Sequence, residues 1–400
     1  MKRLRRLYIT GYGLTPVKRV EDCGILCEDD RILAVGGESG FSLDEPDLEI
    51  YRIAGGYAMP GFIDSHIHGA GGFDASTPLA GPRTLDDMSL QLARRGVTTF
   101  VPTVVAAKPE DMLNNLAALS AMMKTPCRGA DAVGIHIEGP FLNPERRGSQ
   151  QFVRPIDLGF AKELLSAGGG LVRRMTFAPE LPGALDLIEM LVTFDVGSSM
   201  GHSQAGEADT IRAIDAGARC CTHLFNGMPP LHQREITLTA IALTDDRVTT
   251  ELISDGRHID PRMVNLACRC KPADKVVAIS DATMAAGMPD GEYRIGPAAI
   301  VSEAGFTHTR EGKLAGTTTM LDAGWHALMN YSDSSECLAA QSVTLNAARS
   351  LQLYDRGELF PRTRADIAVF EYETNKPLLT VCNGRIVFSE RDFLIKKAEE

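Results

Sequence analysis

The chain has 400 residues, of which 44% are hydrophobic and 23% are charged. This composition excludes a disordered chain and allows one large domain beside a smaller one. The formal net charge of −11 disfavours nucleic acid or an acidic membrane surface as a partner. No stretch approaches the ~18 apolar residues of a membrane span. Since no secretory signal accompanies the nine cysteines, we expect a chain that works in the reducing cytoplasm.

Both ends of the chain have the pattern of short β-strands. Near the start we predict strands at 7–10, 24–27, 32–35 and 51–53. Near the end we predict strands at 367–372 and 378–388, where Asn383-Gly384 is typical of a hairpin turn. We therefore predict that residues 1–58 and 355–400 together form a small β-sandwich domain, and that residues 59–354 form the catalytic domain.

The middle of the chain alternates short apolar runs with stretches of helical periodicity. The eight runs lie at 62–65, 98–102, 133–137, 175–178, 196–200, 218–222, 248–253 and 276–280. The helical stretches include 85–94, 112–123, 184–192 and 207–215. Eight strand–helix repeats predict an α/β fold of the closed (β/α)8 barrel type, with a doubly wound open sheet as the alternative. After the last run, residues 291–313 indicate an inserted hairpin, followed by helices to about residue 353.

Polar residues stand where the predicted barrel strands end, which is where parallel barrels carry their chemistry. His66 and His68 are two residues apart, so they share one face of the first strand, and His136 and Glu138 do the same on the third. Strands five, six and eight are followed by His202, His223 and Asp281. Imidazoles and carboxylates are ligands for zinc or iron, and an open position on the metal carries water. The pattern therefore predicts a metal-dependent hydrolase.

These motifs resemble those of a known family. Residues 60–69, PGFIDSHIHG, resemble the first barrel strand of the amidohydrolase superfamily. The motifs HIEGPF at 136–141, GHS at 201–203, THLFN at 222–226 and SDAT at 280–283 resemble the N-acetylglucosamine-6-phosphate deacetylases, in order across most of the barrel. The resemblance implies hydrolysis of the acetamide of this sugar phosphate, giving glucosamine-6-phosphate and acetate.

The resemblance also implies roles for single residues. Glu138, His202 and His223 would hold the main metal ion, and Asp281 would act as the acid and base. Family members with H-x-H on the first strand can hold a second metal, so His66 and His68 imply one or two divalent ions per chain, zinc first and iron second. Other binuclear members of the superfamily bridge their metals with a carbamylated lysine on strand four. That strand has no lysine here, so Glu138 would have to bridge.

Further residues match the family's substrate contacts. Ser149 and Gln150 match residues that contact the sugar and the acetyl group, and Asn226, Gly227 and Arg234 match residues that contact the phosphate. His258 matches a histidine near the sugar hydroxyls and the phosphate. Thr317 and Thr318 lie in a segment expected near the substrate. In this family the arginine can act across a subunit interface, which implies a homodimer. The chain departs from the family where Ile236-Thr237 replaces Pro-Gly, where glutamine stands at 150 instead of the histidine of some members, and where Gly227 replaces the more usual alanine.

Three alternatives stay open. The departures beside Arg234 leave a different N-acetyl amino sugar as the substrate. A cyclic amidase or D-aminoacylase would use the same barrel, but the missing lysine on strand four and Glu138-Gly139-Pro140 weigh against this. A non-catalytic barrel that serves as a scaffold would be free to lose ligands, and this chain keeps the full set.

Overall fold

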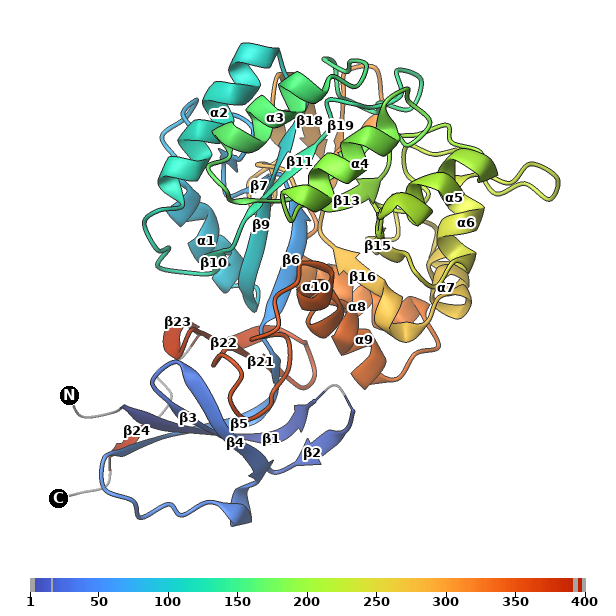
Figure 1. The fold of residues 1–400 in the computed structure, drawn as a ribbon. Coiled ribbons are helices and arrows are strands. Elements are labelled where there is room, and N and C mark those ends of the chain that lie inside the picture. The colour runs from blue at the N-terminus through green and yellow to red at the C-terminus, as the bar shows by residue number, and fades with distance from the viewer. Residues whose placement is uncertain (1–3, 16, 391–394, 398–400) are drawn as a thin grey trace.

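The structure is a computed structural model that describes residues 4–15, 17–390 and 395–397. Its centre is a parallel sheet that forms the barrel (Figure 1). The eight barrel strands are β6 (Phe62–Ile67), β9 (Val97–Val105), β11 (Ile135–Glu138), β12 (Val172–Phe177), β13 (Gly197–Met200), β14 (Cys220–Cys221), β15 (Thr249–Ile253) and β16 (Val276–Ile279). A short strand, β10 (Asp131–Ala132), pairs with β9. The predicted barrel is confirmed, and the open-sheet alternative is wrong.

Helices cover the outside of the barrel. They are α1 (Leu85–Ala93), α2 (Pro109–Met122), α3 (Leu158–Ala167), α4 (Ala184–Thr193), α5 (Glu207–Ala216), α6 (Leu238–Thr244), α7 (Pro261–Cys270), α8 (Leu321–Tyr331), α9 (Glu336–Ser342) and α10 (Leu345–Ser350), with short 3-10 turns at Glu38–Gly40 and Ala273–Lys275. Helix α1 begins with a capping box, in which Thr84 and Asp87 exchange side-chain to backbone hydrogen bonds. Helix α4 buries Leu187, Ile188 and Leu191, the apolar face that its period predicts.

The barrel closes between its last strand and its first. The main chain of Asp281, just after β16, donates to the carbonyl of His66 at 3.0 Å, and the main chain of His68 donates to the carbonyl of Ala282 at 2.8 Å. These bonds lie at the carboxyl ends of β6 and β16. Closure therefore brings the two histidines of the first strand beside the carboxylate that follows the eighth.

The two ends of the chain meet in one antiparallel-rich sheet of nine strands, blue and red in Figure 1. Its strands are β1 (Arg5–Leu14), β2 (Arg19–Glu21), β3 (Cys23–Glu28), β4 (Arg31–Gly37), β5 (Leu48–Pro60), β21 (Ile367–Glu371), β22 (Pro377–Cys382), β23 (Arg385–Ser389) and β24 (Ile395–Lys397). Its two halves share a buried core that includes Tyr8 and Ile25 from one end and Ile367 and Leu379 from the other. The boundaries 1–58, 59–354 and 355–400 stay a prediction.

An inserted sheet follows the eighth barrel strand. It consists of β17 (Gly291–Ile295), β18 (Ala298–Glu303), β19 (Phe306–His308) and β20 (Leu314–Thr317), all antiparallel. Figure 1 shows β18 and β19 at the end of the barrel away from the terminal sheet. A small antiparallel ribbon of β7 (Gly69–Ala70) and β8 (Phe73–Asp74) follows the first barrel strand. Thr317 pairs with Ala282, so this insertion braces the end of the eighth strand. Within the described chain, no helix combines the length and apolarity needed to cross a membrane.

Candidate active site

Two groups of three possible metal ligands face each other at the carboxyl end of the barrel. One group is Glu138, His202 and His223, and the other is His66, His68 and Asp281. Within each group the ligand atoms lie within 4.8 Å of one another, and no member is more than 8% exposed. Glu138 lies between the groups, because its Oε1 is 3.7 Å from Nε2 of His66 and its Oε2 is 3.6 Å from Nε2 of His68. The structure thus brings the five predicted ligands together with Asp281, the predicted acid and base.

The first group converges on one point. Nε2 of His202 and Nε2 of His223 lie 3.1 and 2.9 Å from Oε1 of Glu138, and 3.1 Å from each other. Nδ1 of His202 lies 2.7 Å from the carbonyl of Arg146, so we assign its proton to Nδ1. A neutral imidazole carries one proton, and Nε2 of His202 therefore presents a lone pair to the group.

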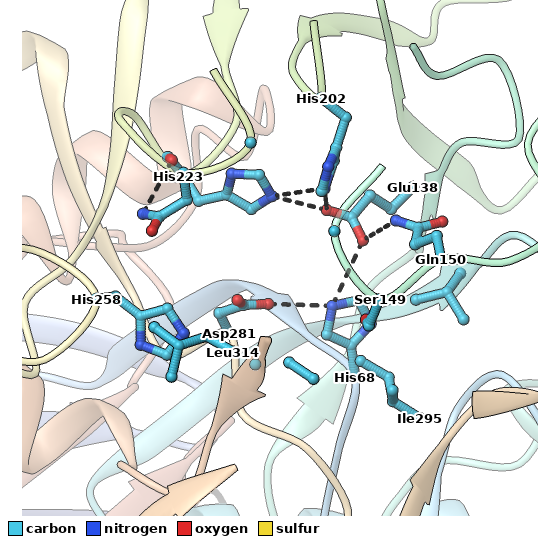
Figure 2. A pocket seen from close by; sticks show the side chains of 16 residues that line it. His68, Glu138, Ser149, Gln150, His202, His223, His258, Asp281, Ile295 and Leu314 are labelled. Atoms are coloured by element: carbon cyan, nitrogen blue, oxygen red, sulfur yellow. Dashed lines mark hydrogen bonds and ion pairs between the residues drawn. The ribbon is translucent and has the colours of Figure 1, made fainter. Parts of the chain in front are cut away.

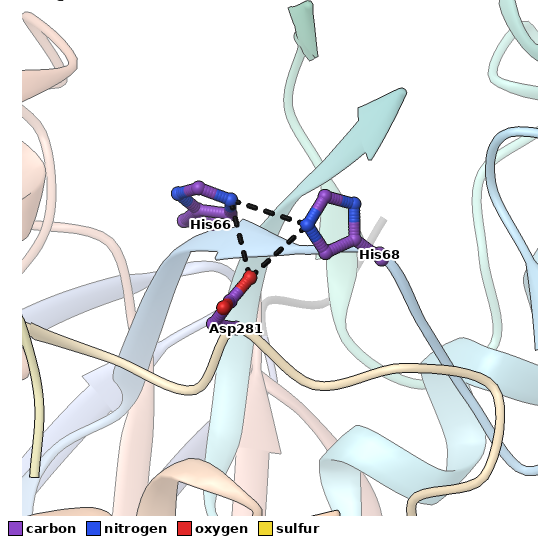
Figure 3. Close-up of side chains that lie close together, drawn as sticks. All are labelled: His66, His68 and Asp281. Atoms are coloured by element: carbon purple, nitrogen blue, oxygen red, sulfur yellow. Dashed lines mark hydrogen bonds and ion pairs between the residues drawn. The ribbon is translucent and has the colours of Figure 1, made fainter. Parts of the chain in front are cut away.

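The second group has the same construction. Nδ1 of His68 donates to the carbonyl of Thr103 at 3.2 Å, and Nδ1 of His66 faces Oε2 of Glu251 at 3.2 Å. Both Nε2 atoms then point to Oδ1 of Asp281, at 3.0 Å from His68 and 3.4 Å from His66 (Figure 3). Among the described residues, Oδ1 of Asp281 is approached by these two imidazole nitrogens but has no partner in full hydrogen-bond geometry.

Sharp turns aim three of these side chains into the site. His202, His223 and Asp281 have φ angles of +48°, +30° and +49°, in the left-handed region that residues other than glycine rarely adopt. Each such residue costs roughly 1–3 kcal/mol, and such strain clusters at functional sites. Each turn comes where a barrel strand ends, so the strand fixes the position from which the side chain projects.

The electrostatics of the site favour positive charge. Burial by itself raises the pKa of Glu138, but His202 and His223 outweigh burial and hold that pKa well below its usual range. Burial by itself lowers the pKa of His202, but Glu138 raises it above the ordinary histidine value. Burial also opposes ionisation of Asp281, yet His68 and His66 keep its pKa low. These groups fit a divalent cation, because imidazole lone pairs and carboxylate oxygens converge on one region, and a bound cation would replace the protons that these groups otherwise share.

A pocket opens over the two groups (Figure 2). Its polar lining consists of His68, Glu138, Ser149, Gln150, His202, His223, Asn226, His258 and Asp281, with Gly148 and Gly227 between them. Gln150 donates to Oε2 of Glu138 at 2.7 Å and accepts from the main chain of Ala106 at 2.9 Å. His258 is held by Asp255, whose Oδ2 lies 2.8 Å from its Nδ1. The structure therefore gathers the predicted residues of the 149–150 and 226–227 loops and His258 at one pocket.

Three predicted substrate residues lie elsewhere. Arg234 is exposed and does not line the pocket. Thr317 is buried and donates to the carbonyl of Ser280 at 2.8 Å, so it supports the residue before Asp281. Thr318 donates to the carbonyl of Gly305 at 3.0 Å. Contacts of these three residues with a substrate stay predictions.

His136 belongs to neither group. Its Nε2 lies 2.8 Å from Oγ1 of Thr176 and its Nδ1 lies 3.2 Å from Oγ1 of Thr103. Burial holds the pKa of His136 well below its ordinary value, so the imidazole is neutral. This histidine fills the barrel interior beneath the ligands, although it shares its strand with Glu138.

Sequence reasoning missed two charged residues behind the site, Glu251 on β15 and Arg174 on β12. Glu251 is fully buried and contacts His66, Ser65 and Arg174. Its signal was present, because Glu251 is the one charged residue in the predicted apolar run 248–253. A carboxylate inside a buried strand must be paired with a positive charge or a metal ion, so its position in that run indicates a structural or functional role.

The chain matches the amidohydrolase family over residues 57–397. It therefore belongs to this family, whose enzymes are metal-dependent. N-acetylglucosamine-6-phosphate deacetylase of Bacillus subtilis is 34% identical over 93% of this chain and 98% of the relative. N-acetylgalactosamine-6-phosphate deacetylase of Escherichia coli O157:H7 is 33% identical over 86% of this chain and 89% of the relative. A mutant N-acetyl-D-glucosamine-6-phosphate deacetylase of Mycobacterium smegmatis, solved with N-acetyl-D-glucosamine-6-phosphate, has a TM-score of 0.89 and 31% identity, covering 96% of this chain and 100% of that one.

Proposed function

We propose that this chain hydrolyses the acetamide of N-acetylglucosamine-6-phosphate to glucosamine-6-phosphate and acetate. The observation that carries the proposal is the pair of three-ligand groups that meet at Glu138 and open into one pocket. An amide resists attack by water, and a site of this kind strengthens both the carbonyl and the water. Similarity to deacetylases of acetylated amino sugar phosphates over nearly the whole chain supports the substrate class.

The ligand groups are assigned as two cation sites. Glu138, His202 and His223 would hold one divalent ion, and His66, His68 and Asp281 would hold a second. Zinc is the first candidate and iron the second, because both accept imidazole and carboxylate ligands. When bound, such ions polarise the acetyl carbonyl and lower the pKa of water from 15.7 towards ~7.

Asp281 is assigned the proton transfers. Burial opposes its ionisation, but His68 and His66 hold its pKa below the ordinary aspartate value, so it is an anion at neutral pH. It therefore accepts a proton from the attacking water and then delivers that proton to the departing nitrogen. Gln150 holds Glu138 through the 2.7 Å bond to Oε2, which keeps that carboxylate oriented between the two groups.

The phosphate requires positive charge at the pocket, and, in the part that the structure describes, a single chain supplies it there only through histidine side chains. Among the described residues that line the pocket there is no lysine or arginine. His258 is one source of charge at the pocket: burial lowers its pKa, but Asp255 outweighs burial and raises that pKa above the usual value. We assign the phosphate to His258 and the 226–227 loop, completed by Arg234 from a second copy of the chain in a homodimer. All nine cysteines are free thiols, which supports a reducing cytoplasm as its compartment.

A second candidate substrate is N-acetylgalactosamine-6-phosphate. The observation that favours it is the 33% identity to the Escherichia coli O157:H7 relative that carries this name, close to the 34% of the Bacillus subtilis relative. The two sugars differ only in the configuration at carbon 4, so the residues that hold the acetyl group and the phosphate serve either one.

The test is acetate release from a panel of purified substrates, with elemental analysis of the same protein. The panel holds N-acetylglucosamine-6-phosphate, N-acetylgalactosamine-6-phosphate, unphosphorylated N-acetylglucosamine and a cyclic amide. We expect the highest kcat/KM on the first and loss of activity after metal removal. Faster turnover of the galactosamine phosphate would favour the second candidate, and turnover of the cyclic amide alone would overturn both.

A further inference from the structure

A buried ion pair lies directly behind His66. Glu251 on β15 and Arg174 on β12 are 0% and 2% exposed, and Nη1 of Arg174 donates to Oε1 of Glu251. Nη2 of Arg174 donates to the carbonyl and the hydroxyl of Ser350 on α10, at 3.2 and 3.1 Å. Arg174 is therefore anchored on one side by the end of a helix and on the other by the carboxylate.

The second oxygen of this carboxylate faces the histidine. Oε2 of Glu251 lies 3.2 Å from Nδ1 of His66, while Oε1 also accepts from the hydroxyl of Ser65 at 3.2 Å. An ionised carboxylate only accepts hydrogen bonds, so His66 carries a proton on Nδ1 when its imidazole is in the neutral form that can bind a metal. Nε2 then presents its lone pair towards Asp281 and His68, where a ligand nitrogen is needed.

We propose that Glu251 is a positioning residue that fixes the tautomer and the ring orientation of His66 for a metal ion, and that Arg174 holds Glu251 in place. This inference rests on the proposed function, since it needs the second cation site at His66, His68 and Asp281. It adds a requirement: the affinity of that site depends on two residues that contact neither substrate nor metal.

A packing role alone does not account for the pair. Buried ion pairs are often replaced by apolar side chains of similar volume without loss of stability, because removing two charges from water is costly. His68 and His202 use backbone carbonyls to fix their Nδ1 protons. His66 instead uses a full negative charge, which makes its imidazole a stronger base and a stronger ligand.

The test is titration of the metal-free protein with Zn²⁺ alone, in competition with a chelator, with circular dichroism as a check of folding. Glu251→Gln keeps an oxygen that accepts a hydrogen bond. The double variant Arg174→Met with Glu251→Leu removes the acceptor and both charges together, so no buried charge is left unpaired. Ser199→Ala is the matched control, because Ser199 is buried in the same interior and its hydroxyl bonds Thr222, at 2.5 Å, which is not a ligand. His66→Ala marks the complete loss of the second site.

We expect the double variant to bind the second Zn²⁺ about 10–100-fold more weakly, the usual cost of losing such a partner, with Glu251→Gln between it and wild type. The first Zn²⁺ and the control variant should be unchanged. Wild-type affinity for the second Zn²⁺ in a folded double variant would overturn the inference and leave the proposed function standing. If His66→Ala itself keeps two Zn²⁺ ions, the assignment of His66 to the second ion fails, and the inference fails with it.

Discussion

Asp281 combines features that seldom coincide at one residue. Its backbone has a φ of +49°, its side chain is 6% exposed, and one carboxylate oxygen lies 3.0 Å from Nε2 of His68. The main chain of Asp281 donates to His66, and its carbonyl accepts from Thr317 at 2.9 Å. Hydrogen bonds to neighbouring strands thus fix the backbone of Asp281 on both sides. They hold it in the strained left-handed conformation that directs the carboxylate into the site.

The substitution Asp281→Asn tests the assigned proton transfers. Asparagine keeps the shape and one oxygen but accepts no proton at neutral pH, so we expect kcat to fall by roughly 100-fold or more. Steady-state kinetics with acetate detection measures the effect, and elemental analysis shows whether the metal content is retained. Near-normal turnover in a folded, metal-loaded variant would remove Asp281 from the acid and base role.

At the residue scale the sequence predicted the ligands better than their support. His66, His68, Glu138, His202 and His223 all lie at or just after the carboxyl ends of strands, in motifs that can be read directly. Glu251 and Arg174 have no motif, because their partners come from strands far apart in the chain and meet only when the barrel closes. A pattern along one segment predicts which face a residue occupies, but not which residue it meets across the barrel.

At the scale of elements, β6 and the residue directly after it carry two ligands. His66 and His68 are both buried, and their Nε2 atoms lie 3.4 Å apart. The double substitution His66→Ala with His68→Ala should therefore lower the metal content towards one ion per chain. The ion at Glu138, His202 and His223 should stay. Elemental analysis after dialysis against metal-free buffer measures this, and two ions per chain in the variant would show that the pair is structural.

A second element, β20, braces the eighth barrel strand. Gly316 has a φ of +66°, and a Cβ there would lie 2.8 Å from the carbonyl oxygen of Asp281 and 2.6 Å from Cγ2 of Thr283. We therefore expect Gly316→Ala to lower both the thermal unfolding midpoint and kcat, because the carbonyl of Asp281 must move.

Gly312→Ala is the control for that change. Gly312 also has a positive φ, +79°, but a Cβ there would meet nothing within 4 Å. The control isolates the backbone penalty of the left-handed conformation, about 1 kcal/mol, and should keep the wild-type kcat. Equal kcat values in the two variants would show that β20 does not position Asp281.

The elements themselves were predicted unevenly. The order and number of the barrel strands follow from the alternation of apolar runs and helical stretches. Their bounds do not, as the sixth strand shows: residues 218–222 were predicted, and only Cys220–Cys221 form a ladder. There the chain turns early, because His223 has a left-handed φ of +30° and Phe225 one of +78°. The pattern of apolar residues along the sequence does not predict such turns.

At the scale of the whole molecule, the net charge of −11 opposes an anionic substrate, so any preference for phosphate must be local. Arg234 lies on the exposed segment before α6, outside the pocket of its own chain. Leu231 and Ile236 on the same segment are 38% and 39% exposed, which would suit a surface covered by a second copy. A homodimer would bring this segment to the pocket of its partner.

Arg234→Ala should weaken phosphate recognition. Arginine forms paired, charge-assisted bonds to phosphate, and losing one such contact costs ~1.5–3 kcal/mol, or roughly 10–100-fold in kcat/KM. The unphosphorylated sugar should be affected little, so the preference between the two substrates should largely disappear. Equal losses on both substrates, or a wild type without any preference for the 6-phosphate, would contradict the assignment.

Mixing two impaired variants decides whether Arg234 acts across subunits. Chains with Arg234→Ala keep Asp281, and chains with Asp281→Asn keep Arg234, so a mixed dimer contains one site with both residues only if Arg234 reaches into the partner. Unfolding and refolding the two variants together should therefore restore activity on the phosphorylated sugar to about a quarter of wild type, since half of the dimers are mixed and each has one complete site. Each variant refolded alone is the control. If the mixture shows only the average of the two controls, Arg234 acts within its own chain or not at all.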